Sequence, residues 1–574
     1  MKNLIYRLCL CLCFFLGQVS VVLADTPLSQ KDENLYRQIF AAQKKEQFKQ
    51  ADALILKLKN QSLVGYVLYD RYFSPAYRTK KTEISKWLKR YSNLAVATDM
   101  YALGQQKKAD LPDQKPKGLF GGRSGSCSAV FRPEPIDLIK NRTFSGLAAK
   151  QRGKAQKKMK QIYRYLNQGK TLKAREILES KSVRQLFPKS DYDMARTALA
   201  FSYFIDGMDD KALSFIEPVL AQSGKEIPQA YWVAGLISWR QGKYDAAAEY
   251  FSTAATHPRT YPFLQSAASV WAARSYLKTG DFEAVRPALE RASRYQRLFY
   301  GILAMRLLAE DLGHVWDEPA LPSDDVSADF SHPALERFYA LNQIGQKDWA
   351  RKELSKLYLD ADDEAKGILL MISEQNGFAS DLLAFSGQLG DGSTRYPAPN
   401  WTPTDGWKVD KALVYAFVRQ ESCFNQRAES EVGALGLMQI MPDTGRELAK
   451  VLQYPFRKQL LKDPAYNLSL GQNYLLKLIQ MPAVGDNLMY IATAYNAGPG
   501  NLIKWKKKIN TNDPLLFLES IPSRETRSFV ERIVVNYWIY RSLMNQPLAS
   551  LNSVATGDWP CYQAMECPMP TQSK

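Results

Sequence analysis

The sequence predicts an all-α protein in which a long array of paired helices precedes a second helical domain. From Asp32 to about Ser380, apolar residues return every three or four positions and strand-like alternation is rare, which is the spacing of amphipathic helices. Glycines also recur at intervals of 35 to 38 residues between helical stretches, each with an alanine a few residues on: Gly169, Gly207, Gly242 and Gly280. This period is typical of helix-turn-helix repeats of the tetratricopeptide kind, which stack into a curved solenoid with a long concave face.

We expect this superhelical array to occupy residues 25–384. Further helix pairs are indicated around Gly345 and, near the start, in the stretch KKEQFKQADALIL at 44–56. The 574 residues exceed what one hydrophobic core can organise, so more than one domain is expected. The concave face could recruit partner proteins, and the sequence leaves open whether the array closes into a ring.

The N-terminus resembles a secretory signal. Lys2 and Arg7 precede an apolar run, Leu8–Val22, and small residues stand before a cleavage point after Ala24. The alternative is a transmembrane anchor, but the run is shorter than the roughly 20 residues that span a bilayer. Residues 1–24 are therefore predicted to be removed, which leaves an exported, periplasmic protein with no transmembrane anchor.

The chain is strongly basic, with a net charge of +18. A basic surface favours polyanions, and in an exported protein these are wall polymers or membrane headgroups more than nucleic acid. An equally good explanation is a basic surface that only aids solubility. One interruption of the array, about 104–160, concentrates Lys, Gly, Pro, Ser and Gln, and predicts a mobile basic loop that runs into a helix.

Four cysteines follow the signal: Cys127, Cys423, Cys561 and Cys567. They can pair in three ways, and the sequence does not choose among these. Proximity favours Cys561 with Cys567. Their spacing gives no paired C-x-x-C motif, so we expect no zinc site, and no other metal or cofactor motif is present.

A second shift in composition, rich in Gly, Pro, Ser and Thr, predicts a linker at 385–408. Its aromatic residues, Tyr396 and Trp401, suggest that it packs against a domain. The second helical domain is then expected at 409–550, and a C-terminal tail at 551–574.

The first helix of this domain carries the most suggestive carboxylate. After a helix-capping Asp410, the residues Leu413, Phe417 and Glu421 fall on one face, which is apolar and ends in an acid. A carboxyl group against apolar surface loses hydration of its charged form, so its pKa rises and it can donate a proton near neutral pH. The alternative is a helix-end residue paired with Arg419 or Arg427.

Polar residues suited to a sugar-binding groove follow this helix. Ser422 comes directly after the acid, and Met438 with Gln439 would offer an apolar surface and an amide for sugar rings and their acetamido groups, although Met438 fits a core position equally well. Farther on, two glycines and a proline break a helix beside Tyr495 and Asn496. A serine or cysteine nucleophile would need a histidine base, but all three histidines precede the linker. The run after Trp505, Lys506 to Lys508, is more often a solvated helix end than an anion site.

These stretches together resemble a known family. ESCFN, GALGLMQIMP, LKDPAYNLSLGQNYLLKL, ATAYNAGPGN and IPSRETRSFVERI, in this order, look like the catalytic domain of soluble lytic murein transglycosylases, a lysozyme-like fold related to goose-type lysozyme. The helical array, including RLFYGILA, resembles the superhelical domain that precedes this module. Departures are Gln426, where the family commonly has proline, and Cys423 and Glu429 beside the acid.

The resemblance implies residue roles and a reaction. It places the single catalytic acid on Glu421, its neighbouring serine on Ser422, the groove pair on Met438 and Gln439, the active-site tyrosine on Tyr495, and the motif glutamate on Glu525. The implied substrate is the peptidoglycan glycan strand, cleaved between N-acetylmuramic acid and N-acetylglucosamine with formation of a 1,6-anhydro ring. Partners among wall-synthesis proteins are a further expectation.

Two alternatives remain open at the level of the sequence. One is a lysozyme-type hydrolase in which Glu429 or Glu431 activates water. The other is a non-catalytic scaffold that binds the wall and recruits proteins through its repeats.

Overall fold

The computed structural model describes residues 27–116, 135–140, 143–310, 312, 332–378 with short gaps, and 396–562. The predicted signal segment, Cys127, Cys567, most of the low-complexity part of the basic insertion, the first part of the linker and the last twelve residues lie outside the described residues.

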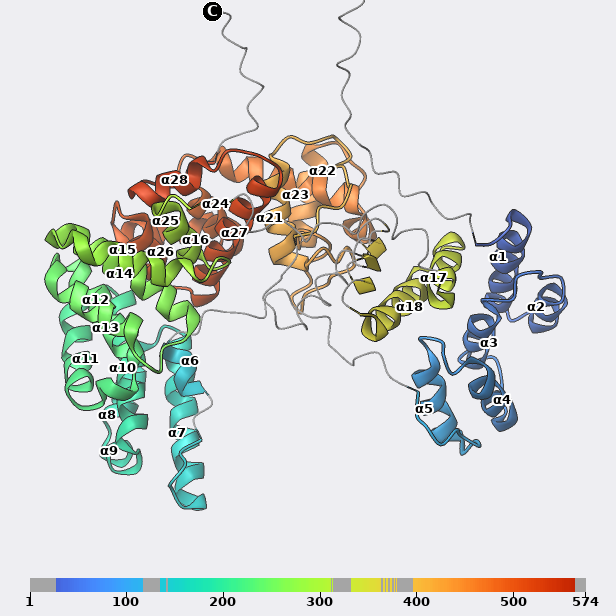
Figure 1. Cartoon of the computed structure of the whole chain (residues 1–574), viewed down its shortest axis with the longest axis horizontal. Helices are drawn as coiled ribbons and strands as arrows, with labels where there is room; N and C mark the ends of the chain where they lie inside the picture. Colours follow the sequence, from blue (N-terminus) through green and yellow to red (C-terminus); the bar gives the residue numbers. More distant parts are fainter. Residues whose placement is uncertain are drawn as a thin grey trace, which may run out of the picture. The chain divides into compact units, whose positions relative to one another are not determined.

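The regular elements of the described chain are helices, and within it β-type pairing is confined to isolated bridges. The chain divides into two compact units, which are described separately: residues 1–124 with 319–382, and residues 125–318 with 383–574. The prediction of an all-α protein is therefore confirmed (Figure 1).

The first unit contains α1(Gln30–Lys44), α2(Phe48–Ile55), α3(Val64–Tyr72), α4(Lys81–Tyr91), α5(Ala97–Lys107), α17(Pro333–Gln343) and α18(Lys347–Asp360). Segments far apart in the sequence meet in its core. The fully buried carboxylate of Glu353 accepts hydrogen bonds from Tyr66, from the backbone N–H of Ala95 and from Arg337, the last at 2.9 Å. Because a buried charge needs such partners, this cluster fixes α18 against α3.

The second unit begins with α6(Pro135–Lys140), α7(Ala149–Asn167), α8(Thr171–Glu179), α9(Lys181–Leu186), α10(Lys189–Ile205), α11(Asp209–Ser223), η1(Gly224–Glu226), α12(Pro228–Arg240), α13(Tyr244–Thr256), α14(Pro262–Thr279), α15(Phe282–Ser293) and α16(Phe299–Leu307). Consecutive helices from α10 to α16 pack side by side (Figure 1).

The repeat glycines lie in the turns between paired helices, as predicted. Gly169, Gly207, Gly242, Gly280 and Gly345 each adopt a φ between +67° and +81°. A side chain rarely tolerates this left-handed conformation, which explains why glycine marks each turn.

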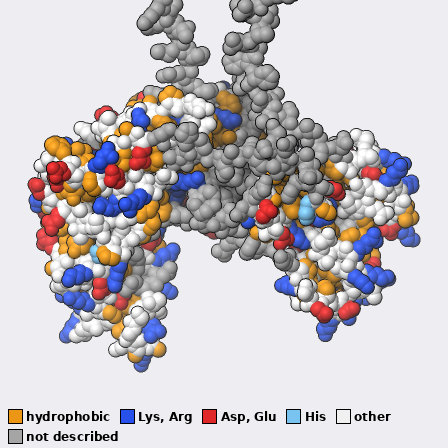
Figure 2. Space-filling view, in the orientation of Figure 1, with side chains coloured by type: hydrophobic (Ala, Val, Ile, Leu, Met, Phe, Trp, Pro, Cys, Tyr) orange, Lys and Arg blue, Asp and Glu red, His pale blue; other side chains and the backbone are white. Residues whose placement is uncertain are grey.

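The helix predicted at the end of the basic insertion is present as α7, whose buried residues are Ala155, Met159, Ile162 and Leu166. Most of its Lys and Arg residues are exposed. Figure 2 shows Lys and Arg side chains spread over the visible surfaces of both units. The mobile loop predicted before it falls largely outside the described residues.

The C-terminal helices of the second unit are α21(Lys411–Ser422), α22(Pro442–Val451), η3(Lys458–Lys462), α23(Pro464–Ile479), α24(Leu488–Ala497), α25(Pro499–Ile509), α26(Pro514–Ser520), α27(Arg524–Leu543) and α28(Ala549–Thr556). The long helix α27 is central, since α16, α21, α24 and α26 all pack against it. The residues that it buries include Trp538, Tyr537 and Tyr540.

Polar and aromatic contacts join these helices to the preceding array within the second unit. Tyr300 of α16 donates a 2.6 Å hydrogen bond to Glu519, and both side chains are buried. Asp513 accepts from Trp239 Nε1 at 3.1 Å and from Arg274 at 2.8 Å. The ring of Phe299 stacks on Trp538 with a centroid distance of 5.2 Å.

The described part of the linker packs on the C-terminal domain, as its aromatic residues predicted. Tyr396 packs against Tyr540, and Trp401 against Phe424. At the other end of the domain, the first residues of the predicted tail also belong to the packed structure. Tyr562 accepts a hydrogen bond at its hydroxyl from the backbone N–H of Asp410 at 3.0 Å.

The predicted pairing of Cys561 with Cys567 is wrong. Cys561 is a free, exposed thiol, whereas Cys423 takes part in a disulfide. The backbone of Cys561 bridges to Asn487, so this residue is held by the fold of the chain. Short separation in the sequence was therefore a poor guide to the pairing.

Among the residues that the structure describes, no helix combines the length and apolar composition needed to cross a membrane.

Candidate active site

The helix α21 places Glu421 in its last turn. Asp410 caps the N-terminus by accepting a hydrogen bond from the Ala412 N–H at 3.0 Å, as the sequence predicted. Every residue from Ala412 to Arg419 is buried. The helix ends at Cys423, whose φ of 52° is left-handed. The acid thus lies two positions beyond a run of eight buried residues, where the helix ends.

Burial of the Glu421 carboxyl raises its pKa to about 8. The negative charge of Glu525 raises it further, and the positive charge of Arg532 opposes this. The C-terminal end of α21 carries partial negative charge, which also disfavours a carboxylate. At neutral pH this acid therefore holds a proton that it can donate, which is the property that the apolar helix face predicted.

Arg532 on α27 is held beside the acid. Its Nε donates a 2.6 Å hydrogen bond to the side-chain oxygen of Gln420. Burial lowers the pKa of the guanidinium, and the charges of Glu531, Glu525 and Glu421 raise it. Its positive charge is available to stabilise Glu421 once the acid has lost its proton. Arg419, in contrast, lies with its guanidinium 4.2 Å from the ring centroid of Tyr396.

Ser422 and Tyr495 make different contacts near this helix end. The hydroxyl of Ser422 is buried and donates to the Val418 carbonyl at 3.1 Å, which ties it to its own helix. Tyr495, on α24, donates to the Met438 carbonyl at 2.7 Å, and its ring lies 4.5 Å from Phe417. Burial and then the charge of Glu421 raise the pKa of Tyr495, so its hydroxyl stays protonated.

Met438 is buried in the core, with no exposed side-chain surface. The sulfur of Met438 packs against Gly471 of α23. A Cβ at position 471 would lie 2.0 Å from this sulfur, so the close packing requires a glycine there. The backbone N–H of Met438 donates to Asn467 Oδ1 at 2.8 Å. The structure therefore directs the carbonyl, and not the side chain, of Met438 toward Tyr495.

The loop before α22 has a strained backbone. Phe424 and Gln439 have φ values of 61° and 46°, conformations that cost energy for residues with a side chain. The side-chain amide of Gln439 donates to the Gly436 carbonyl at 3.0 Å and thereby supports the turn. Gly436 is required there, because a Cβ would lie 2.0 Å from the Leu461 carbonyl oxygen.

Asn496 and Glu525 come together at the start of α27. Asn496 Oδ1 accepts a 2.7 Å hydrogen bond from the hydroxyl of Thr526, which follows Glu525. Glu525 itself is exposed, and its charge acts on both Glu421 and Arg532. The structure thus brings the predicted residues Glu421, Tyr495, Asn496 and Glu525 to one region.

Glu429 has other partners. It forms ion pairs with Lys458 at 3.4 Å and Lys462 at 3.0 Å, and hydrogen bonding and charge from these lysines lower its pKa. It remains exposed to solvent. Glu431 is also exposed.

Three residues were missed by sequence reasoning: Gln420 and Arg532 beside the acid, and Asn467, which contacts Met438. Asn467 is fully buried and donates to the carbonyls of Leu435 and Leu461, at 3.0 and 2.8 Å, while it accepts from Met438. A polar amide within the mostly apolar stretch YNLSLG was a usable signal for it. Nothing in the local pattern distinguished Arg532 from a surface arginine.

The site consists of one protonated acid at the end of an enclosed helix, a tyrosine and an arginine beside it, and a constrained loop. The fold and this site define an all-α protein with a single candidate acid and base in its C-terminal domain. The transglycosylase SLT domain model matches residues 402–517, which contain most of these residues.

Named relatives agree with this match. The soluble lytic murein transglycosylase of Escherichia coli is 29% identical over 301 residues, which are 50% of this chain and 45% of that protein. The endo-type membrane-bound lytic murein transglycosylase A of Klebsiella pneumoniae is 30% identical over 150 residues, 24% of this chain and 72% of that protein. The chain belongs to the SLT family of lytic transglycosylases. Its match with the Escherichia coli relative spans less than half the length of that relative.

Solved structures share the whole fold. The 70 kDa soluble lytic transglycosylase of Escherichia coli superposes with a TM-score of 0.69 at 18% identity, covering 93% of this chain and 99% of that chain. The lytic transglycosylase Slt of Pseudomonas aeruginosa gives a TM-score of 0.58 at 19% identity, with 93% and 99% covered. These likenesses establish a superhelical domain followed by a lysozyme-like domain.

Proposed function

We propose that this protein cleaves peptidoglycan glycan strands as a lytic transglycosylase. The observation that carries the proposal is the pKa of Glu421, raised to about 8 at the end of a buried helix. Membership of the SLT family supports the same chemistry. The bond attacked is the β-1,4 link between N-acetylmuramic acid and N-acetylglucosamine, and the site of action is the periplasm.

In the first step, protonated Glu421 gives its proton to the glycosidic oxygen as the bond to C1 breaks and positive charge develops on the sugar ring. The leaving N-acetylglucosamine end keeps that proton. Glu421 is now ionised, and the charge of Arg532 stabilises it.

In the second step, ionised Glu421 takes the proton from the C6 hydroxyl of the same muramic acid. The C6 oxygen then bonds to C1 and closes the 1,6-anhydro ring. One carboxyl group therefore serves first as the acid and then as the base. The reaction needs no second carboxylate and consumes no water. Tyr495, the carbonyl of Met438, Gln439 and Asn496 are proposed to orient the sugar, with Ser422 supporting the helix end.

A hydrolase would need a second carboxylate to activate water. Glu429 is a poor candidate, because Lys458 and Lys462 pair with its charge. Digestion of purified sacculi followed by mass spectrometry separates the two reactions, since anhydro products are one water lighter than hydrolytic ones. Reducing-end muramic acid as the main product would exclude the proposed reaction.

Two variants complete the test. Glu421→Gln should release no muropeptides while its binding to sacculi is retained, which also separates an enzyme from a wall-binding scaffold. Glu429→Gln removes the other carboxylate and should leave the rate and the anhydro products unchanged. Normal release by Glu421→Gln would show that another group carries the proton.

A further inference from the structure

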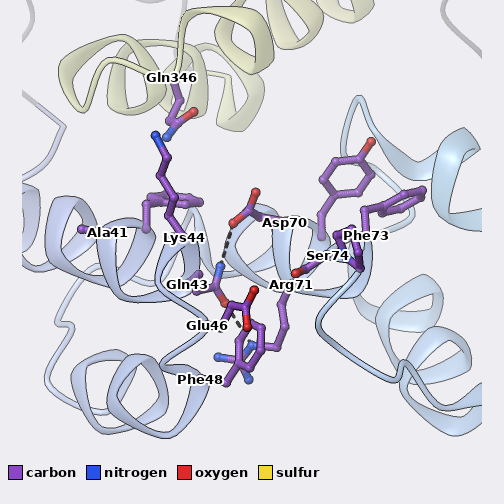
Figure 3. A pocket seen from close by; sticks show the side chains of 13 residues that line it. Ala41, Gln43, Lys44, Glu46, Phe48, Asp70, Arg71, Phe73, Ser74 and Gln346 are labelled. Atoms are coloured by element: carbon purple, nitrogen blue, oxygen red, sulfur yellow. Dashed lines mark hydrogen bonds between the residues drawn. The ribbon is translucent and has the colours of Figure 1, made fainter.

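The first unit contains a cavity of about 630 Å³, which belongs to none of the elements of the candidate active site. The last turns of α1 and α3 line it, together with Phe48 at the start of α2 and Gln346, the residue that precedes α18 (Figure 3). Its volume lies within the range of ordinary ligand sites.

A chain of buried polar side chains orients one carboxylate in this cavity. Gln43 Nε2 donates to Asp70 Oδ2 at 3.0 Å, and Gln43 Oε1 accepts from Arg71 Nε at 2.9 Å (Figure 3). Arg71 is held in turn by an ion pair with Asp52 at 2.7 Å. Gln43 and Arg71 are only 4% and 6% exposed, so the chain is part of the core and holds Asp70 in place.

The second oxygen of Asp70 is open to a ligand. Among the described residues no donor reaches Oδ1, although burial raises the pKa of this carboxyl and makes an unpartnered charge costly. Asp70 also lies in the last turn of α3. Helix C-termini carry partial negative charge, so this side of the cavity favours a cation.

The opposite side of the cavity favours an anion. Lys44 extends its ammonium toward Gln346 (Figure 3), and no carboxylate among the described residues forms an ion pair with Lys44. Gln346 is the N-cap residue of α18, where the helix presents free N–H groups and partial positive charge.

Aromatic rings also line the cavity. Phe40, Phe48, Tyr69 and Phe73 all line the cavity. Their faces suit the apolar part of a ligand, and they can also contact an ammonium group through its positive charge.

We propose that this cavity binds a short peptide that carries a free ammonium and a free carboxylate. The ammonium of the peptide bonds to Asp70 Oδ1, and its carboxylate lies between Lys44 and the start of α18. The aromatic rings contact the part of the peptide between these two charged groups. The choice of a peptide over a free amino acid rests on the proposed function, because short peptides branch from the glycan strands that this function would cleave.

Calorimetric titration of the full chain with trialanine tests the charge pattern. Blocking either end, as N-acetyl-trialanine or trialanine amide, should weaken binding about tenfold or more, because each block removes one charge-assisted contact. Free alanine should bind more weakly than trialanine. Equal binding of free alanine would overturn the peptide assignment, and no saturable binding of trialanine up to about 10 mM would overturn the site.

Variants locate the binding. Asp70→Asn keeps an oxygen that accepts from Gln43 but loses the negative charge, and it should weaken trialanine binding about tenfold or more. Lys44→Met should weaken binding of trialanine while leaving that of trialanine amide unchanged. Asp110→Asn, which removes one exposed carboxylate outside the cavity, is the matched control and should bind normally.

Unchanged affinity in Asp70→Asn would overturn the proposal. Glu421→Gln should bind trialanine as well as the unaltered chain does, because binding needs no turnover. Failure of the proposed reaction would therefore be distinguishable from failure of this site.

Discussion

The hydroxyl of Tyr495 donates a 2.7 Å hydrogen bond to the carbonyl of Met438, and its ring lies 4.5 Å from Phe417, one helical turn before Glu421. One side chain thus joins α24, the loop before α22 and the helix that carries the acid. The hydroxyl oxygen of Tyr495 can still accept a hydrogen bond from a substrate donor.

Replacing Tyr495 with Phe keeps the ring contacts and removes this hydrogen bond. We expect a loss of about 1 kcal/mol in the free energy of unfolding and about a tenfold loss of muropeptide release, because the loop carbonyl loses its partner. Urea unfolding and timed digestion of sacculi measure the two effects. Tyr474→Phe is the control and should keep normal release; the ring centroid of Tyr474 lies 5.3 Å from that of Tyr495. Equal effects of both variants would contradict the role of Tyr495.

The alkaline limit of activity should follow the pKa of Glu421. Because the acid must begin protonated, release should fall as the pH rises through about 8. The charge of Glu525 raises this pKa, so Glu525→Gln should move the limit to lower pH.

Arg532→Met should move the same limit to higher pH, since the charge of Arg532 lowers the pKa of Glu421. Each shift should be a few tenths of a pH unit to about one unit, measured from initial rates across the pH range. Shifts in the same direction for both variants would show that these charges do not act on the acid.

Glu421→Gln should stabilise the fold in a pH-dependent way. The carboxyl has its ordinary pKa in the unfolded chain and a pKa of about 8 in the folded one. Between these values the folded state binds more protons, so the carboxyl destabilises the fold progressively as the pH rises, and the glutamine removes this loss.

For Glu421→Gln we expect the free energy of unfolding to rise by about 1–3 kcal/mol at pH 8 and to change little at pH 4. The value at pH 8 is reduced because solvent partly reaches the site. Denaturant unfolding at both pH values measures this change. A gain that is the same at pH 4 and pH 8 would rule out titration of Glu421 as its cause.

Asp513→Ala should cost about 2–4 kcal/mol of unfolding free energy. The carboxylate caps α26 through the N–H groups of Leu515 and Leu516 and also pairs with Arg274, which would be left half-buried without it. Asp443→Ala, in the exposed first turn of α22, is the control and should cost less than about 0.5 kcal/mol. Equal losses would mean that the contact with Arg274 contributes nothing.

Local patterns predicted much of this molecule correctly. A glycine in each repeat turn reflects a backbone angle that other residues resist, so it was visible without a structure. The rise in the Glu421 pKa was visible in the same way, because the spacing of Leu413, Phe417 and Glu421 already places the acid on an apolar face.

Contacts between distant segments were not predictable from those patterns. The free thiol of Cys561 depends on how the end of the chain pairs with Asn487. The contact of Met438 with Gly471 and the bond of Arg532 to Gln420 join residues 33 and 112 positions apart. Sequence spacing indicates which face of a helix is apolar, but not which helix covers it.

Because of the hydrogen bond between Tyr300 and Glu519, the C-terminal domain is poorly suited to transfer into another protein by itself. A fragment cut before residue 396 would carry Glu519 without the hydroxyl that it now contacts and would present the face of Trp538 that Phe299 covers. Exchanging such domains between relatives should succeed only when α16 is transferred with them, so the part of this chain that folds as one unit is larger than the segment that bears the acid.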